Sequence, residues 1–117
     1  AALAAARIVT HRVFKIAVDA RALPVPVAEP PPTADAPVIF DVGDGGSGCR
    51  FPWALLGERA PTATFIAGGI TPDNVPALLW HRPWGIDLSS GVESTPGIKD
   101  AVRMCRLFAA IKALPCA

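Results

Sequence analysis

The chain is poor in the residues that build metal centres and disulfide scaffolds. Its three cysteines and two histidines include no Cys-x-x-Cys pair and no histidine at a ligand spacing. A zinc site and a disulfide framework are therefore both disfavoured. We expect no metal, no other cofactor and a reducing compartment, with the cytoplasm as the first choice and a plastid left open.

Long apolar runs and strongly charged segments are also missing. No stretch reaches the roughly 18–20 apolar residues that a membrane-spanning helix needs, and the alanine-rich start lacks the charged lead of a secretory signal. The net charge is +1 and no basic run occurs, which disfavours nucleic acid as a partner. The sequence thus predicts binding to neither membrane nor nucleic acid.

The composition is sufficient for one hydrophobic core. A chain of 117 residues forms one domain at most. Hydrophobic residues make up 51% and charged residues only 18%, which argues against disorder. Because residue 1 is alanine and not methionine, we expect residues 1–117 to be a single partial domain that begins inside a longer product.

Four short apolar segments alternate with segments that favour helices or loops. The first of them is rich in β-branched residues, as is typical of a strand covered on both faces. The expected strands are residues 12–18, 38–41, 64–67 and 86–88. A proline-rich insert at residues 24–37 should be extended, because proline removes a backbone donor. The alternation predicts an α/β fold of four parallel βα units.

Helices are expected after the second, third and fourth strands. The first of them should begin within residues 51–56. Thr71 is a candidate N-terminal cap for the second helix, and Pro76 should remove one backbone hydrogen bond from that helix. Asp100 caps the last helix, where a core-facing stripe is formed by Met104, Leu107, Phe108 and Ile111. We also expect three aromatic side chains to fill the layer between helices and sheet: Trp80, Trp84 and Phe108.

Two of the strands run into turns rich in glycine and serine. The fourth strand ends in Ser89-Ser90-Gly91 and the third in Gly68-Gly69. Neighbouring parallel strands end at one edge of a sheet, so the backbone N–H groups of both turns can converge on an anion. In eight-fold barrels such a phosphate cup follows strands 7 and 8. The plainer interpretation is a pair of tight turns that need positive φ.

Four motifs follow one another along the chain. They are Phe40-Asp41; Gly46-Ser47-Gly48 with Phe51-x-Trp53; Gly68-Gly69-Ile70-Thr71-Pro72-x-Asn74; and Asp87-x-Ser89-Ser90-Gly91-Val92-Glu93 with Pro96-Gly97-x-Lys99-Asp100. Together they resemble phosphoribosylanthranilate isomerase, the family that catalyses the third step of tryptophan biosynthesis on a TIM (β/α)8 barrel. The resemblance covers only strands 5 to 8, and implies that the chain is the C-terminal half of such a barrel.

The resemblance also implies a reaction. The family converts N-(5-phosphoribosyl)anthranilate to 1-(o-carboxyphenylamino)-1-deoxyribulose 5-phosphate by an Amadori rearrangement, which needs an acid at the ring oxygen and a base for a carbon-bound proton. Asp41 stands where the family has its general acid, although a carboxylate that merely caps a strand end is the alternative. The substrate phosphate would bind the backbone N–H groups of Gly68, Gly69, Ser89, Ser90 and Gly91.

Two further residues are expected near the substrate. Asp87 either orients the neighbouring turn or serves as a structural carboxylate, and Arg50 would keep a positive charge facing the anionic substrate. Cys49 is interpreted as a passive substitution and not as a nucleophile.

Part of the family's site has no counterpart in this sequence. The general base of the family is a cysteine at the end of the first strand, and an arginine on the second βα loop holds the anthranilate carboxylate; no segment here matches either. We expect the chain alone to be nearly inactive. The expected partners are the sugar-phosphate substrate and either a missing N-terminal half-barrel or a fused tryptophan-pathway domain. A non-catalytic sugar-phosphate-binding half-barrel is the main alternative, and another sugar-phosphate barrel, such as a synthase or epimerase, is the third.

Overall fold

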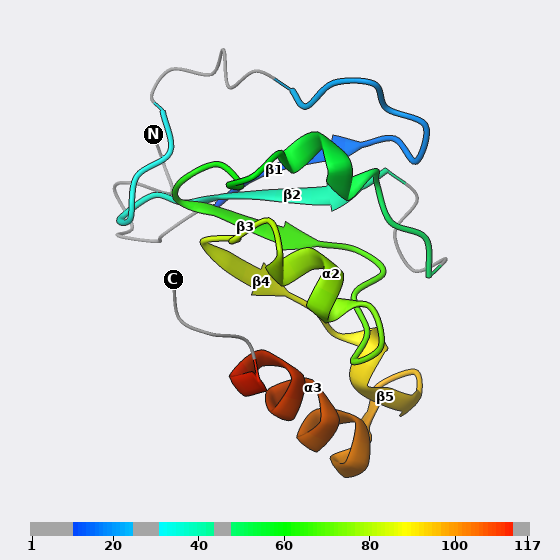
Figure 1. The fold of residues 1–117 in the computed structure, drawn as a ribbon. Helices are drawn as coiled ribbons and strands as arrows, with labels where there is room; N and C mark the ends of the chain where they lie inside the picture. Colours follow the sequence, from blue (N-terminus) through cyan, green and yellow to red (C-terminus); the bar gives the residue numbers. More distant parts are fainter. Residues whose placement is uncertain (1–10, 25–30, 44–47, 114–117) are drawn as a thin grey trace.

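The computed structural model describes residues 11–24, 31–43 and 48–113 (Figure 1). A four-stranded parallel sheet forms its centre, with the strands in sequence order: β1 (Arg12–Ile16), β2 (Val38–Val42), β3 (Thr64–Ala67) and β4 (Gly85–Asp87). All four expected strands are present, and the main difference is that β1 ends at Ile16. The parallel sheet confirms the expected α/β class.

The register of the sheet places polar side chains together at the carboxyl ends of the strands. Lys15 is paired with Asp41, and Ala67 is paired with Asp87. Side chains of paired residues project to the same face of a parallel sheet. The arrowheads of β1 to β4 in Figure 1 point toward one end of the molecule, where the loops that carry the candidate site are found.

The elements that follow β1 and β2 are not full helices. Among the described residues no helix connects β1 to β2. The segment after β2 forms only the single 3-10 turn η1 (Trp53–Leu56) instead of the expected helix. Pro52 precedes this turn in an extended conformation, and Gly57 ends it with φ 68°, a left-handed value that favours glycine. The first half of the described chain is therefore less helical than a regular βα repeat.

The proline-rich insert at residues 24–37 is partly outside the described residues, which resume at position 31. Its described end is a tight turn and not an extended polyproline helix. Thr33 and Ala36 exchange two backbone hydrogen bonds, 3.2 and 3.0 Å long, and the hydroxyl of Thr33 accepts a third from the N–H of Ala36. These local bonds outweigh the extended preference of the flanking prolines.

Helix α2 (Val75–Leu79) begins four residues later than Thr71. Thr71 instead forms a turn with Asn74, in which the side chain of each residue accepts a hydrogen bond from the backbone N–H of the other. Pro76 consequently falls in the first turn of the helix, where an N–H group has no partner within the helix. The expected loss of a hydrogen bond at Pro76 does not occur.

The chain between β4 and the last helix forms a short 3-10 turn and a hairpin. These are η2 (Ser90–Val92), β5 (Glu93–Thr95) and β6 (Ile98–Lys99), and helix α3 (Ala101–Ala113) follows. Asp100 is the N-terminal cap of α3, as expected, because its Oδ1 accepts a hydrogen bond of 2.9 Å from the N–H of Arg103. None of the helices in the described parts of the chain has the length and apolar character of a membrane span.

The hydrophobic core lies between the sheet, η1, α2 and α3. Its fully buried members include Phe40, Phe51, Ile66, Val75 and Leu78. Only Leu107 of the expected α3 stripe is buried, and Ile111 is half-buried.

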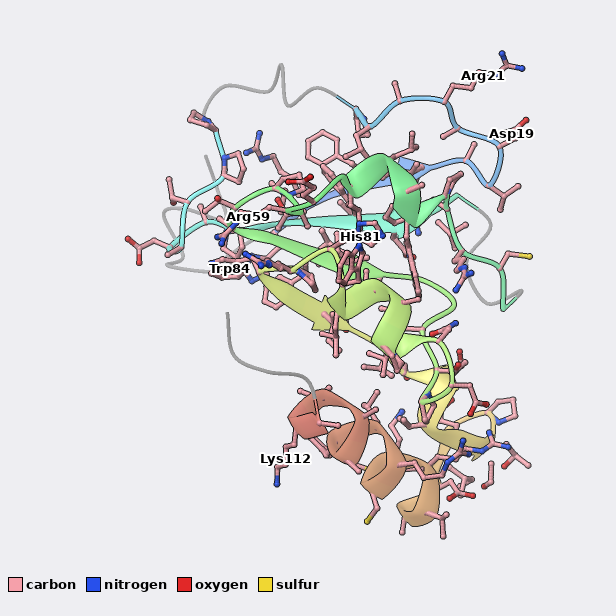
Figure 2. The ribbon with its side chains drawn as sticks, viewed as in Figure 1. Asp19, Arg21, Arg59, His81, Trp84 and Lys112 are labelled. Carbon is pink, nitrogen blue, oxygen red and sulfur yellow. The ribbon has the colours of Figure 1, made fainter. Side chains whose placement is uncertain are left out.

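The three aromatic side chains expected in the interior are exposed instead: Trp80 by 78%, Trp84 by 44% and Phe108 by 53%. Figure 2 shows Trp84 at the end of the sheet where the strands begin. The ring of Trp84 packs edge-on against Phe65 of β3, with 5.3 Å between the ring centres, and the rest of its surface is exposed.

Candidate functional site

A cavity of about 330 Å³ opens at the carboxyl ends of β2, β3 and β4. This volume is within the range of small-molecule sites, roughly 300–1,000 Å³. Its lining residues are Asp41, Gly48, Ala67, Gly68, Gly69, Ile70, Asp87, Leu88, Ser89, Ser90 and Gly91. The structure thus brings together, around one cavity, Asp41, Asp87 and all five residues expected to contact a phosphate.

The turns after β3 and β4 are packed directly against each other. A Cβ atom on Gly91 would lie 1.8 Å from the carbonyl oxygen of Ile70, which is far inside any allowed contact. Only glycine lets the two backbones approach so closely. The two turns therefore form one continuous wall of the cavity.

Gly68 and Gly69 combine positive φ with close packing. Their φ angles are 93° and 68°, in the left-handed region. A Cβ on Gly68 would lie 2.8 Å from Oδ1 of Asp41, and one on Gly69 would lie 2.5 Å from the carbonyl oxygen of Cys49. Positive φ and close packing both require glycine here, as the tight-turn interpretation of the Gly-Gly pair expects, and anion binding stays a prediction.

Asn74 fixes the turn after β3. Its Nδ2 donates a hydrogen bond of 2.7 Å to the carbonyl of Gly69, while its Oδ1 accepts one of 2.8 Å from the N–H of Thr71. Sequence reasoning included Asn74 in a motif without assigning it a role. An asparagine three residues after a Gly-Gly-x-Thr turn is the available signal, because such side chains bond to nearby backbone.

Asp41 is held by two hydrogen bonds at the mouth of the cavity. Oδ1 accepts from the N–H of Val42 at 2.8 Å, and Oδ2 forms an ion pair with Nζ of Lys15 at 2.8 Å. The bond to Val42 is the strand-end cap considered for Asp41, and Asp41 also lines the cavity; its role as a general acid stays a prediction. The contact with Lys15 was not anticipated, although β1 and β2 place the two residues side by side.

Ser89 is held by the β5–β6 hairpin. Nζ of Lys99 donates to its hydroxyl at 3.0 Å and to its carbonyl at 3.3 Å, and the same ammonium forms an ion pair with Glu93 at 2.6 Å. The hydrogen bond from Lys99 is the main reason that the pKa of Glu93 lies below its ordinary value. This network was also not anticipated from the sequence.

One expected residue does not line the cavity. The guanidinium of Arg50 lies 4.3 Å from the ring centre of Trp53, a cation–π geometry, and Arg50 is not among the lining residues. Gly46 and Ser47 of the glycine-rich motif lie outside the described residues, whereas Gly48 lines the cavity. Among the described residues, no three histidine, cysteine or acidic side chains gather closely enough to hold a metal ion.

The family model for N-(5'phosphoribosyl)anthranilate (PRA) isomerase matches residues 6–110. The chain belongs to this family. The N-(5'-phosphoribosyl)anthranilate isomerase of Thiobacillus denitrificans is 49% identical over 70 residues, which are 59% of this chain and 34% of that protein. The tryptophan biosynthesis protein TrpCF of Yersinia pestis is 43% identical over 74 residues, 63% of this chain and 16% of that protein. The matched region is thus about a third of the isomerase from Thiobacillus.

A solved structure of the family confirms the barrel type of the fold. The phosphoribosyl anthranilate isomerase from Thermococcus kodakaraensis superposes with a TM-score of 0.62 at 25% sequence identity. The match covers 96% of this chain and 56% of that structure. The parallel sheet is therefore of the TIM-barrel type, and residues 11–24, 31–43 and 48–113 contain four of its strands.

Proposed function

We propose that this chain is the C-terminal half of a phosphoribosylanthranilate isomerase site, the half that binds the substrate phosphate and carries the general acid. One observation carries the proposal: a single cavity is lined by both glycine- or serine-rich turns and by the carboxylate of Asp41. The substrate has a phosphate at one end and a furanose ring next to it, so a phosphate cup beside an acid matches its chemistry.

The phosphate would be bound chiefly by backbone. Both turns line the cavity, and glycine at positions 68, 69 and 91 lets them pack against neighbouring groups with no side chain in between. Several N–H groups directed at one point form a binding site for a dianion without any basic side chain in contact. The described lining residues agree with this mode, because they include no lysine or arginine.

Asp41 would donate a proton to the ring oxygen and so open the furanose ring. Its pairing with Lys15 suits the carboxylate, whereas a general acid must carry a proton. We infer that the anionic substrate attracts Lys15 away from Asp41 when it binds, and that Asp41 then takes up a proton from solvent, which it can donate. Asp87 lines the same cavity at the end of β4 and is exposed.

The general base and the group that holds the anthranilate carboxylate would come from outside these residues. Cys49 and Cys105 are exposed, and neither lines the cavity. Among the described strands, β1 pairs only with β2 and β4 only with β3, so each has one side where a further strand could pair. We propose that an N-terminal half-barrel, in the same polypeptide or as a separate partner, closes the barrel along both edges.

A titration tests the binding half of the proposal. Ribose 5-phosphate should shift the backbone amide NMR signals of residues 68–69 and 89–91 in the 117-residue chain, and free ribose should not. Shifts scattered over the sheet, or none at saturating ligand, would contradict the phosphate site.

An assay in two arms tests the catalytic half. The chain alone should convert phosphoribosylanthranilate at a negligible rate. Addition of the part of the Thiobacillus isomerase that this chain does not cover should raise the rate. Phosphate binding without any gain in rate would favour the non-catalytic sugar-phosphate-binding half-barrel.

A further inference from the structure

The β5–β6 hairpin directs one lysine onto the turn that follows β4. The register of the hairpin pairs Glu93 with Lys99, and their side chains form an ion pair of 2.6 Å. The same ammonium reaches back ten residues to both oxygens of Ser89. An ammonium has three N–H donors, and three acceptors at bonding distance therefore satisfy Lys99 completely.

Glu93 holds the lysine in place. The side chain of Glu93 is only 11% exposed, while that of Lys99 is 48% exposed. The backbone carbonyl of Glu93 also accepts a hydrogen bond from the guanidinium of Arg103 on α3. The hairpin is thus fixed to α3 on one side and, through Lys99, to Ser89 on the other.

The contact with Ser89 has a direct consequence for the cavity wall. In a trans peptide the carbonyl of one residue and the N–H of the next point in opposite directions. The carbonyl of Ser89 accepts hydrogen bonds of 3.3 Å from Lys99 and from the N–H of Val92, so the N–H of Ser90 must point away from both donors. Ser90 lines the cavity, whereas Lys99 does not.

The hydroxyl of Ser89 is also engaged. It accepts a hydrogen bond from Lys99 at 3.0 Å, and its own proton is directed to Glu93 at 3.4 Å. This hydroxyl therefore belongs to the network of Ser89, Glu93 and Lys99, and the hydroxyl of Ser90 is the one left to a ligand.

We propose that Lys99, held by Glu93, is a positioning residue for the phosphate site: it orients the Ser89–Ser90 peptide so that the N–H of Ser90 faces the bound anion. This inference rests on the proposed function. Lys99 acts through geometry and not through its charge, because the carboxylate of Glu93 at 2.6 Å neutralises it.

The two modes of action predict opposite signs for one substitution. If Lys99 acted on phosphate by charge, Glu93→Gln would free that charge and tighten binding. If Lys99 positions the turn, Glu93→Gln loosens the lysine and weakens binding. Inorganic phosphate and ribose 5-phosphate, titrated into the 117-residue chain and followed through its amide NMR signals, separate these outcomes.

We expect Lys99→Met to raise the Kd for both ligands by about fivefold to tenfold, which corresponds to the loss of one or two hydrogen bonds. Glu93→Gln should raise it by a smaller factor in the same direction, and Lys99→Arg should recover part of the affinity. Lys112→Met is the matched control, because Lys112 lies at the far end of α3 (Figure 2). Tighter binding by Glu93→Gln, or unchanged Kd in Lys99→Met, would overturn the proposal.

A ligand-free measurement separates this inference from the proposed function. In Lys99→Met the amide signals of Ser90 and Gly91 should move and their hydrogen exchange should accelerate, while the signals of β1 to β3 stay in place. If the unmodified chain binds no phosphate, the proposed function fails, and these signals still decide whether Lys99 orients the turn. Unchanged signals at both residues would show that it does not.

Discussion

Gly68 and Asp41 are packed so closely that no side chain fits between them. A Cβ on Gly68 would lie 2.8 Å from Oδ1 of Asp41, 2.8 Å from Cγ1 of Val42 and 3.0 Å from the backbone nitrogen of Val42. The turn that would bind the phosphate and the carboxylate that would protonate the ring are thus in direct contact. Asp41 and the turn can approach this closely only because residue 68 has no Cβ atom.

Gly68→Ala should consequently lower the free energy of unfolding by more than the cost of its backbone conformation alone. The positive φ of 93° costs an alanine roughly 1–2 kcal/mol. The close contact of the new methyl group with the backbone nitrogen of Val42 adds to this cost, because a backbone atom has little freedom to move. Gly97→Ala is the control: its φ is also positive, at 83°, but nothing lies within 4 Å of the added methyl. Urea unfolding should give a larger loss of stability for Gly68→Ala, by at least about 1 kcal/mol. Equal losses would show that φ alone matters.

The turn after β3 depends on the amide of Asn74. Asn74→Ala removes the hydrogen bonds to the carbonyl of Gly69 and from the N–H of Thr71. We expect a loss of about 1–3 kcal/mol in unfolding free energy together with weaker phosphate binding. Asn74→Asp keeps the acceptor for Thr71 and loses only the donor to Gly69, so it should lie between the alanine variant and the unmodified chain. Asp73 is exposed and adjacent to Asn74 in the sequence, so Asp73→Asn serves as a control. It should change the free energy of unfolding by less than Asn74→Ala or Asn74→Asp does.

The residues at the strand ends could be predicted from the sequence, because strand periodicity and glycine-rich turns are local signals. Asp41, Gly68 and Ser89 were found in this way, and one cavity contains them all. The side chains that hold the site were missed. Lys15 lies 26 positions from Asp41 and Lys99 ten from Ser89. Such contacts depend on strand register and on the path of the hairpin, which no short pattern encodes.

The prediction that three aromatic side chains are buried was wrong for a different reason. Large aromatic side chains are often buried, and this was the basis for placing three of them in the core: Trp80, Trp84 and Phe108. Whether an apolar side chain is buried depends on what packs against it, and these three side chains remain 44–78% exposed in the described structure. Intrinsic helix signals were similarly overruled at residues 51–56, where Gly57 ends η1 after one turn.

Stability at acid pH should depend on Glu93. Its pKa in the folded chain is lowered below the ordinary value of 4.5, chiefly by the hydrogen bond from Lys99. A carboxyl with a depressed pKa in the folded state stabilises the protein above its unfolded pKa, and this contribution is lost as the pH falls through the folded pKa. The urea midpoint should therefore decrease from about pH 5 to about pH 3 more steeply in the unmodified chain than in Glu93→Gln. Parallel curves would mean that the ion pair makes no difference to folding.

Asp41→Asn separates catalysis from phosphate binding. The amide keeps the shape of the side chain but has no proton to give to a ring oxygen. In the two-segment mixture the isomerase rate should fall by about 10²–10⁴-fold, the usual contribution of a general acid. Ribose 5-phosphate should bind the variant at least as tightly, because a negative charge is removed from the cavity wall. Asp87→Asn provides the comparison: if Asp87 only orients the turn after β4, its loss should change phosphate affinity more than rate. A large fall in rate in Asp87→Asn with little change in Asp41→Asn would assign the acid to the end of β4 instead of β2.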